Sequence, residues 1–222
     1  MKKFIPLLLI AASLFFTSCG ASKFFSGNAS NIDSITLVSP YSYLTDAFGE
    51  WQTNYFDAPS QLNQQLISEV VGNIGLPVKK SASIDYKSDV DAANWMRHLS
   101  EIGAAGAKRQ EVPAQIVDAV KKSGSNYGLL ITDVGFCKSE NQLEAEAALE
   151  TSRRVVDLLK NGNLHLYDDT KAYKTGVYSL IFDSNTGKPV WFGSIPRGYK
   201  NNPTDRESII RQMERLFKDF LK

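Results

Sequence analysis

The stretch Tyr127–Phe136, YGLLITDVGF, is the most apolar run after the amino-terminal region. A continuous apolar run of this kind is typical of a strand that is buried on both faces. Just before it, Pro113 and Gly124 bracket a segment whose apolar residues repeat at helical spacing. We therefore expect Tyr127–Phe136 to be the central strand of a sheet, preceded by a helix that packs on that sheet.

Upstream of that helix, the chain alternates between strand and helix patterns. Ile35–Ser39 (ITLVS) predicts a short strand that Pro40 ends, and Leu76–Tyr86 predicts a second strand. Between them, Pro59–Ile74 carries apolar residues along one helical face. Ser88–Asp91 has the spacing of a capping box, which predicts the start of another helix.

Downstream of the central strand, Tyr173–Asp183 and Pro189–Ile195 both alternate in polarity and predict a hairpin. Gly187 lies in the turn between them, where a positive φ is needed. The box Thr204–Glu207 predicts a closing amphipathic helix. Its apolar face is formed by Ile209, Ile210, Met213, Leu216, Phe217 and Phe220.

Together these patterns predict an α/β (α+β) fold with a single mixed sheet of about five strands, a carboxy-terminal hairpin and packed helices. We expect one domain over 32–222, with an insertion around 138–172. Within the insertion, Leu143–Leu149 favours a helix, whereas Val155–Leu166 resembles a hairpin around an Asn-Gly pair. The insertion is either a partner contact or a plain connection between strands.

The amino terminus has the order of a secretory signal. Lys2 and Lys3 precede the apolar run Phe4–Phe16, which is shorter than the roughly 20 residues that span a bilayer as a helix. The run ends in Phe16–Gly20 (FTSCG), which resembles a bacterial lipobox. That resemblance implies removal of residues 1–18 and lipidation of Cys19. The alternatives are a plain signal peptide with an incidental cysteine, or an uncleaved anchor.

Residues 19–31 are rich in Gly, Ser and Asn and predict a short tether. In the sorting rules known for lipoproteins of two-membrane bacteria, an aspartate after the cysteine retains the protein in the inner membrane, and here the residue is Gly20. We therefore expect a lipid anchor in the outer membrane, with the domain facing the periplasm. Acyl chains contribute about 0.8 kcal/mol per buried methylene, so several chains would hold the protein firmly.

Composition and charge exclude several classes of protein. The chain has 25 Lys and Arg against 24 Asp and Glu over 222 residues. It therefore lacks the excess of basic residues that is typical of nucleic-acid-binding proteins, and nucleic acid is not an expected partner. Two cysteines cannot make a disulfide framework or a four-cysteine zinc site. Asp168 and Asp169 are more typical of a solvated loop than of a cation site. We expect no metal and no cofactor.

Catalytic motifs are not found in the sequence. Lys174–Gly176 matches one motif of the serine penicillin-interacting enzymes, but no serine has a lysine three residues later, so the nucleophile motif is missing. His98 and His165 lie in no recognisable motif. Cys137 is expected to be a small core residue rather than a nucleophile. We expect the protein not to be an enzyme.

The candidate contact residues are the aromatics Trp51, Tyr55 and Phe56, in a segment that we expect to be irregular. They form either a peptide or glycan platform or ordinary packing.

The order of lipobox, strands, helices and hairpin, with the Asp183–Trp191 turn DSNTGKPVW, resembles a group of envelope lipoproteins. The group includes the curli-secretion lipoprotein and the lipoprotein activators of penicillin-binding proteins, and the amino-terminal domain of the Tol translocation protein is similar. The resemblance implies a non-catalytic protein-protein interaction or assembly module in the cell envelope. Its partner would be an envelope protein, with oligomers possible. The alternative is an envelope ligand-binding or weakly hydrolytic protein that uses Trp51–Phe56.

Overall fold

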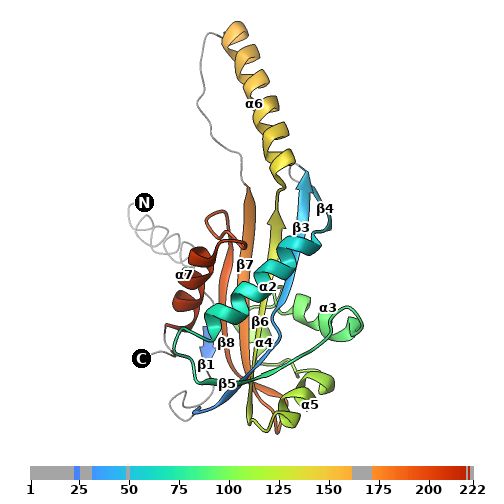
Figure 1. Ribbon diagram of the computed structural model, residues 1–222, viewed down its shortest axis with the longest axis vertical. Coiled ribbons are helices and arrows are strands. Elements are labelled where there is room, and N and C mark those ends of the chain that lie inside the picture. The colour runs from blue at the N-terminus through green and yellow to red at the C-terminus, as the bar shows by residue number, and fades with distance from the viewer. Residues whose placement is uncertain (1–22, 26–31, 49–50, 162–171, 219, 221–222) are drawn as a thin grey trace, which may run out of the picture.

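The computed structural model describes residues 23–25, 32–48, 51–161, 172–218 and 220. They form one mixed sheet flanked by helices (Figure 1). The strands are β1 (Lys23–Phe25), β2 (Ile35–Val38), β3 (Tyr41–Phe48), β4 (Trp51–Tyr55), β5 (Val78–Ala82), β6 (Tyr127–Cys137), β7 (Tyr173–Asp183) and β8 (Lys188–Gly198). The helices are α2 (Asp57–Val71), α3 (Val90–His98), α4 (Ala104–Ala107), α5 (Ala114–Lys122), α6 (Glu140–Asn161) and α7 (Arg206–Phe217).

Strand β6 is the centre of the sheet, as the sequence predicts. The strand order is β1-β8-β7-β6-β2-β5, and β3 also pairs with β6, beyond β2. Antiparallel β7 accompanies β6 along its whole length, whereas parallel β2 and then β3 share its other edge. Pro40 separates β2 from β3 because proline has no backbone N–H to donate to a ladder.

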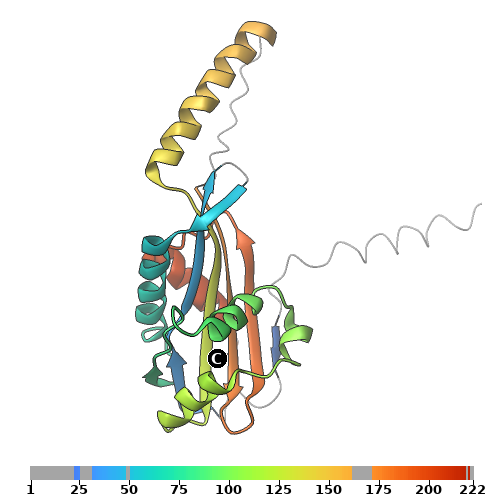
Figure 2. The same ribbon diagram turned by 90° about the vertical axis from the view of Figure 1, so that its right-hand side faces the viewer.

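The helices cover both faces of the sheet. On one face, α2 and α7 pack against β6 residues such as Leu129 and Ile131. On the other face, α3, α4 and α5 pack around Leu130, Phe182 and Phe192. Figure 2 shows α2, in teal, along one side of the sheet, whereas the green helices α3 and α4 lie apart from α2. Because both faces are covered, the continuous apolar run of β6 is buried, and the α/β fold class is confirmed.

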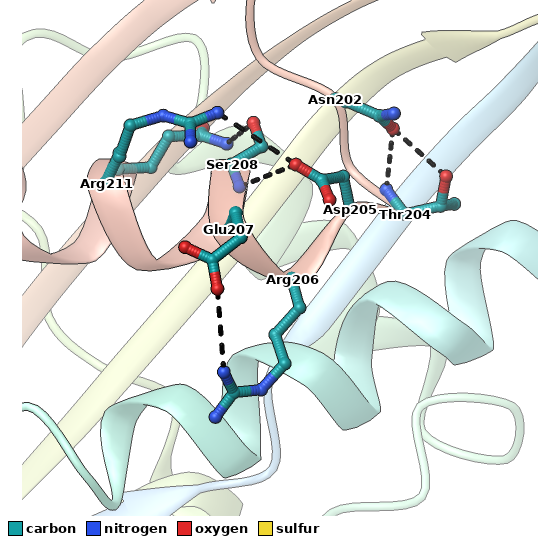
Figure 3. Close-up of polar contacts among 8 residues, drawn as sticks. Asn202, Thr204, Asp205, Arg206, Glu207, Ser208 and Arg211 are labelled. Atoms are coloured by element: carbon teal, nitrogen blue, oxygen red, sulfur yellow. Dashed lines mark hydrogen bonds and ion pairs between the residues drawn. The ribbon is translucent and has the colours of Figure 1, made fainter.

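Two predicted helix starts are shifted by one residue. The cap of α3 is Asp89, whose carboxylate accepts from the N–H of Ala92 at 2.9 Å. The cap of α7 is Asp205, which accepts from the N–H of Ser208 at 2.8 Å, as Figure 3 shows. Thr204 precedes that cap, and Asn202 Oδ1 accepts hydrogen bonds from its backbone N–H and its hydroxyl. An aspartate at the cap also places negative charge at the positive end of each helix.

The predicted carboxy-terminal hairpin is confirmed. Gly187 has φ of +69°, and its N–H donates to Asp183 O at 2.8 Å, which closes the turn between β7 and β8. Trp191 and Ile195 share one face of β8 and belong to the core beneath α7.

Within the described residues, the sheet has eight strands rather than about five. The additional strands include the hairpin β3–β4, so the segment Trp51–Tyr55, which we expected to be irregular, is a strand. Lys23–Phe25, inside the expected tether, pairs with β8. Among the described residues, no helix is long and apolar enough to cross a bilayer.

The insertion contains one long helix, α6, of 22 residues. The hairpin interpretation of Val155–Leu166 is therefore wrong for residues 155–161, and the remainder lies outside the described residues. Ala, Leu and Glu dominate the start of α6, and a helix that has begun propagates at little cost. Ion pairing between Glu150 and Arg154, four residues apart at 3.5 Å, supports the continuation.

Candidate functional site

Several elements that are not part of the core lie at one end of the sheet. There, β3 and β4 form a hairpin, β6 ends at Cys137, and α6 leaves the body and extends away from it (Figures 1 and 2). Lys138 fixes the base of α6, because its buried ammonium group pairs with Glu146 Oε2 at 2.5 Å. The helix is therefore attached to the sheet by a largely desolvated ion pair as well as by the chain itself.

A row of four phenol rings in mutual contact leads from the core to the surface at this end. Tyr43 stacks on Tyr55 at 5.4 Å and lies 6.4 Å from Tyr41 between ring centroids. Tyr41 meets Tyr86 edge-on at 5.0 Å. Tyr41 is buried, whereas Tyr55 is 41% exposed. We call Tyr41, Tyr43, Tyr55 and Tyr86 the tyrosine row.

The tyrosine row is held together by ring contacts and by one nearby cation. The guanidinium carbon of Arg97, from α3, lies 5.0 Å from the centroid of the Tyr43 ring, which is cation–π geometry. Burial raises the pKa of Tyr41 and of Tyr86 above the ordinary phenol value. Tyr86 also donates its hydroxyl to Ser39 O at 2.8 Å. These two phenols therefore stay neutral at physiological pH.

The structure separates the three aromatics that the sequence singled out. Tyr55 joins the tyrosine row through the register of β4 on β3. Phe56 is half-buried at the start of α2, where its N–H donates to Leu44 O at 2.8 Å. Trp51 pairs with Phe48 at the start of β4, and its side chain lies outside the described residues. Tyr55 alone of the three is shown to take part in a stacked aromatic cluster.

Helix α6 exposes apolar side chains along one face. Leu149 is 56%, Val155 51%, Val156 45% and Leu159 80% exposed. Ala145, Ala148 and Ser152 lie on the same face, because residues three, four and seven apart align on a helix. We call these seven residues the apolar stripe. Single exposed apolar residues are ordinary, whereas contiguous exposed apolar surface is less common in monomeric soluble proteins.

A buried polar cluster lies on the α2 face of the sheet. The carboxyl of Asp133, on β6, accepts a hydrogen bond from Asn63 Nδ2 at 3.1 Å. The same nitrogen donates to Pro203 O at 2.7 Å, so Asn63 links β6 to the segment before α7. Burial raises the pKa of Asp133 to about 7, and the hydrogen bond from Asn63 and the positive charge of Arg197 only partly oppose this.

The polar side chains of this cluster are enclosed by the core. Asp133 and Asn63 are fully buried. Thr175, from the Lys174–Gly176 match, is also fully buried and donates its hydroxyl to Asn201 O at 2.8 Å. His98 lies on the exposed surface of α3, 3.2 Å from Glu101. Among the described residues, no group of three His, Cys, Asp or Glu side chains could hold a metal ion.

Of the two cysteines, only Cys137 lies among the described residues. Cys137, at the end of β6, is half-buried rather than a fully buried core residue, and burial raises the pKa of its thiol. Cys19, His165, Asp168 and Asp169 lie outside the described residues, as do residues 1–18.

A separate shallow groove of about 530 Å³ lies between α2 and the strands β2 and β5. Its lining includes Ser39, Ser68 and the edge strand with Lys79 and Lys80. The groove contains none of the three predicted aromatics. It therefore gives no pocket to the ligand-binding interpretation of Trp51–Phe56.

No family model matches the chain, and no curated protein sequence matches it. Among solved structures, the PelC dodecamer from Paraburkholderia phytofirmans is similar with a TM-score of 0.41 and 9% identity, covering 91% of this chain and 96% of that chain. A single-substitution variant of the same dodecamer has a TM-score of 0.41 and 8% identity, covering 91% and 97%. At this TM-score and identity, the similarity carries no conclusion about function.

Proposed function

We propose that the protein is a lipid-anchored, non-catalytic protein-protein interaction module of the cell envelope, and that α6 is its contact element. The observation that carries the proposal is the apolar stripe on a helix that stands clear of the body. Exposed apolar surface costs free energy in water, and burial against a protein partner recovers it.

The proposed anchor and the contact element lie at different places on the sheet. Cys19 precedes β1 by four residues, so lipid on Cys19 would hold β1 within about 14 Å of the membrane. β1 pairs with the middle of β8, whereas α6 leaves from the far end of β6 (Figure 1). An anchored domain would thus keep α6 available to a protein partner.

The absence of an enzymatic role is part of the proposal. Asp133 has the most strongly raised acid pKa of the described carboxyls, yet it is fully buried. A general acid or base must lie within hydrogen-bond reach of its substrate. Asp133, the carboxyl with the most perturbed pKa, therefore supports a structural role rather than a catalytic one.

The alternative of ligand binding rests on the exposed ring of Tyr55, stacked on Tyr43 beneath Arg97. An aromatic face with a nearby cation suits a sugar ring or an aromatic peptide side chain. Titration of the full chain with N-acetylglucosamine oligosaccharides tests this. Saturable binding that Tyr55→Ala abolishes would favour the alternative over the proposed function.

The anchor is tested by Cys19→Ala. We expect this variant to leave the membrane fraction or to remain an uncleaved precursor. Membrane fractionation and mass identical to those of the natural chain would overturn the lipid anchor.

The contact element is tested by photocrosslinking in intact cells. A photoreactive amino acid at Leu159 is expected to give discrete protein adducts, because that side chain is the most exposed of the large apolar side chains of the stripe. The matched control is Lys121, which is exposed on α5 at the opposite end of the sheet. Equal labelling from both positions, or adducts from neither, would contradict the proposal.

A further inference from the structure

The apolar stripe of α6 has a symmetry that points to one particular partner. Measured from Ser152, its other members lie at three, four and seven residues in both directions. These members are Leu149 and Val155, Ala148 and Val156, and Ala145 and Leu159. A second helix of the same sequence, running antiparallel, would meet the same spacing in reverse.

The acidic and basic residues of α6 lie in different halves of the helix. The half before Thr151 contains four glutamates and no Lys or Arg. The half from Thr151 onward contains three basic residues and one Asp. These basic residues are Arg153, Arg154 and Lys160. Antiparallel pairing places the acidic half of each copy beside the basic half of the other, whereas parallel pairing places like charges together.

From these observations we propose that α6 pairs with α6 of a second copy of this chain, antiparallel, about a two-fold axis at Ser152. The proposal rests on the proposed function, because it names the partner of the same contact element. A two-fold interface uses one patch on both copies, and the stripe is such a self-complementary patch. Each small residue of the first half then faces a larger apolar residue of the second half.

The centre of the pair suits close approach. The hydroxyl of Ser152 already donates to Ala148 O at 2.9 Å, so its burial leaves no donor unsatisfied. With 22 residues, α6 is about 33 Å long. It extends beyond the sheet (Figures 1 and 2), so the two bodies would lie at opposite ends of the helix pair and would not compete for the stripe.

A lipid surface is the less favoured occupant of the stripe. Helices that lie in a membrane interface carry mainly Lys and Arg on their polar side. α6 carries five acidic residues against three basic residues. Its charge therefore opposes binding to an anionic bilayer, whereas the division of charge along the helix suits a second α6.

The test is disulfide crosslinking in the full chain, purified in a mild detergent with Cys137→Ser to remove the half-buried thiol. After oxidation, Ser152→Cys is expected to link to itself, since two copies of this position meet on the axis. A mixture of Ala145→Cys and Leu159→Cys chains is expected to link several-fold more than either variant alone. The background without an introduced cysteine accounts for any linkage through Cys19.

The matched control is Ala147→Cys, which is exposed on the opposite face of α6 and next to Ala148 in the sequence. It is expected not to link. Linkage of Ala147→Cys equal to that of Ser152→Cys, or self-linkage of Leu159→Cys above that of the mixture, would overturn antiparallel pairing.

Absence of linkage from every stripe position would also overturn the pairing. If photocrosslinks from Leu159 to a different protein then persist, the proposed function stands without self-pairing. Unfolding temperatures of all variants, compared with the natural chain, show whether a negative result reflects loss of the fold.

Discussion

The indole ring of Trp191 stacks on the phenyl ring of Phe217, with centroids 5.1 Å apart and an interplanar angle of 23°. Phe220 meets the same indole edge-on at 6.0 Å. The contact joins β8 to α7 and encloses one side of the core. Trp191 and Phe217 are both buried, so the contact locks the closing helix onto the sheet.

This contact predicts a large cost for Phe217→Ala. Truncation of a buried Phe typically lowers the free energy of unfolding by about 3–5 kcal/mol. Urea denaturation measures the loss. Lys218→Ala is the control, because Lys218 is exposed and such substitutions usually change stability by less than about 0.5 kcal/mol. Equal stability of the two variants would show that α7 does not dock through this face.

Asp133 predicts a pH dependence of stability. Its pKa is about 7 in the folded chain, against about 3.9 in an unfolded chain. The folded state therefore binds a proton that the unfolded state releases between these values, and stability falls as the pH rises from about 4 to above 7. The whole effect amounts to roughly 4 kcal/mol.

The isosteric variant Asp133→Asn removes the titration and keeps an oxygen acceptor for Asn63. We expect the variant to lose much less stability than the natural chain between pH 4.5 and pH 8 in urea denaturation. If both chains have the same pH dependence, Asp133 does not titrate as a buried acid.

We expect the thiol of Cys137 to react slowly in the native state. Its side chain is half-buried and burial raises its pKa, so both access and the thiolate fraction are reduced. Labelling with a maleimide at neutral pH is expected to be much slower before denaturation than after it. The Cys137→Ser chain reports labelling of any other thiol. Rapid native labelling that disappears in Cys137→Ser would reopen a redox role.

The sequence predicts the elements whose pattern is local. β6 is a continuous apolar run, β7 and β8 alternate around Gly187, and α7 has a capped apolar face, so each could be identified without knowledge of its neighbours. β3 could not, because the segment after Pro40 mixes aromatic and polar residues and its parallel pairing with β6 joins residues that are about ninety positions apart.

Propensity and turn signals compete in α6. Val155 and Val156 are β-branched, and the Asn-Gly pair that follows is typical of a hairpin. The preceding Ala, Leu and Glu residues start a helix, and the described structure continues it to Asn161. Apolar periodicity along the stripe could have favoured the helix.

The tyrosine row could be predicted only in part. Tyr55 is found from the aromatic segment, but its neighbour Tyr43 comes from a strand that the sequence did not reveal. Arg97 arrives from α3, more than forty residues later in the chain. Such a cluster depends on sheet register and helix packing, which single-sequence patterns do not contain.

The most direct test of pairing through α6 is sedimentation velocity of the full chain in a non-ionic detergent. The natural chain is expected to sediment as a concentration-dependent dimer, and Ala147→Glu, on the opposite face of α6, is expected to behave in the same way. Val156→Glu places a charge in the middle of the apolar stripe and is expected to sediment as a single chain with an unchanged circular dichroism spectrum. A natural chain that stays monomeric at every concentration, or a Val156→Glu chain that dimerises as Ala147→Glu does, would contradict the pairing of α6 with a second copy.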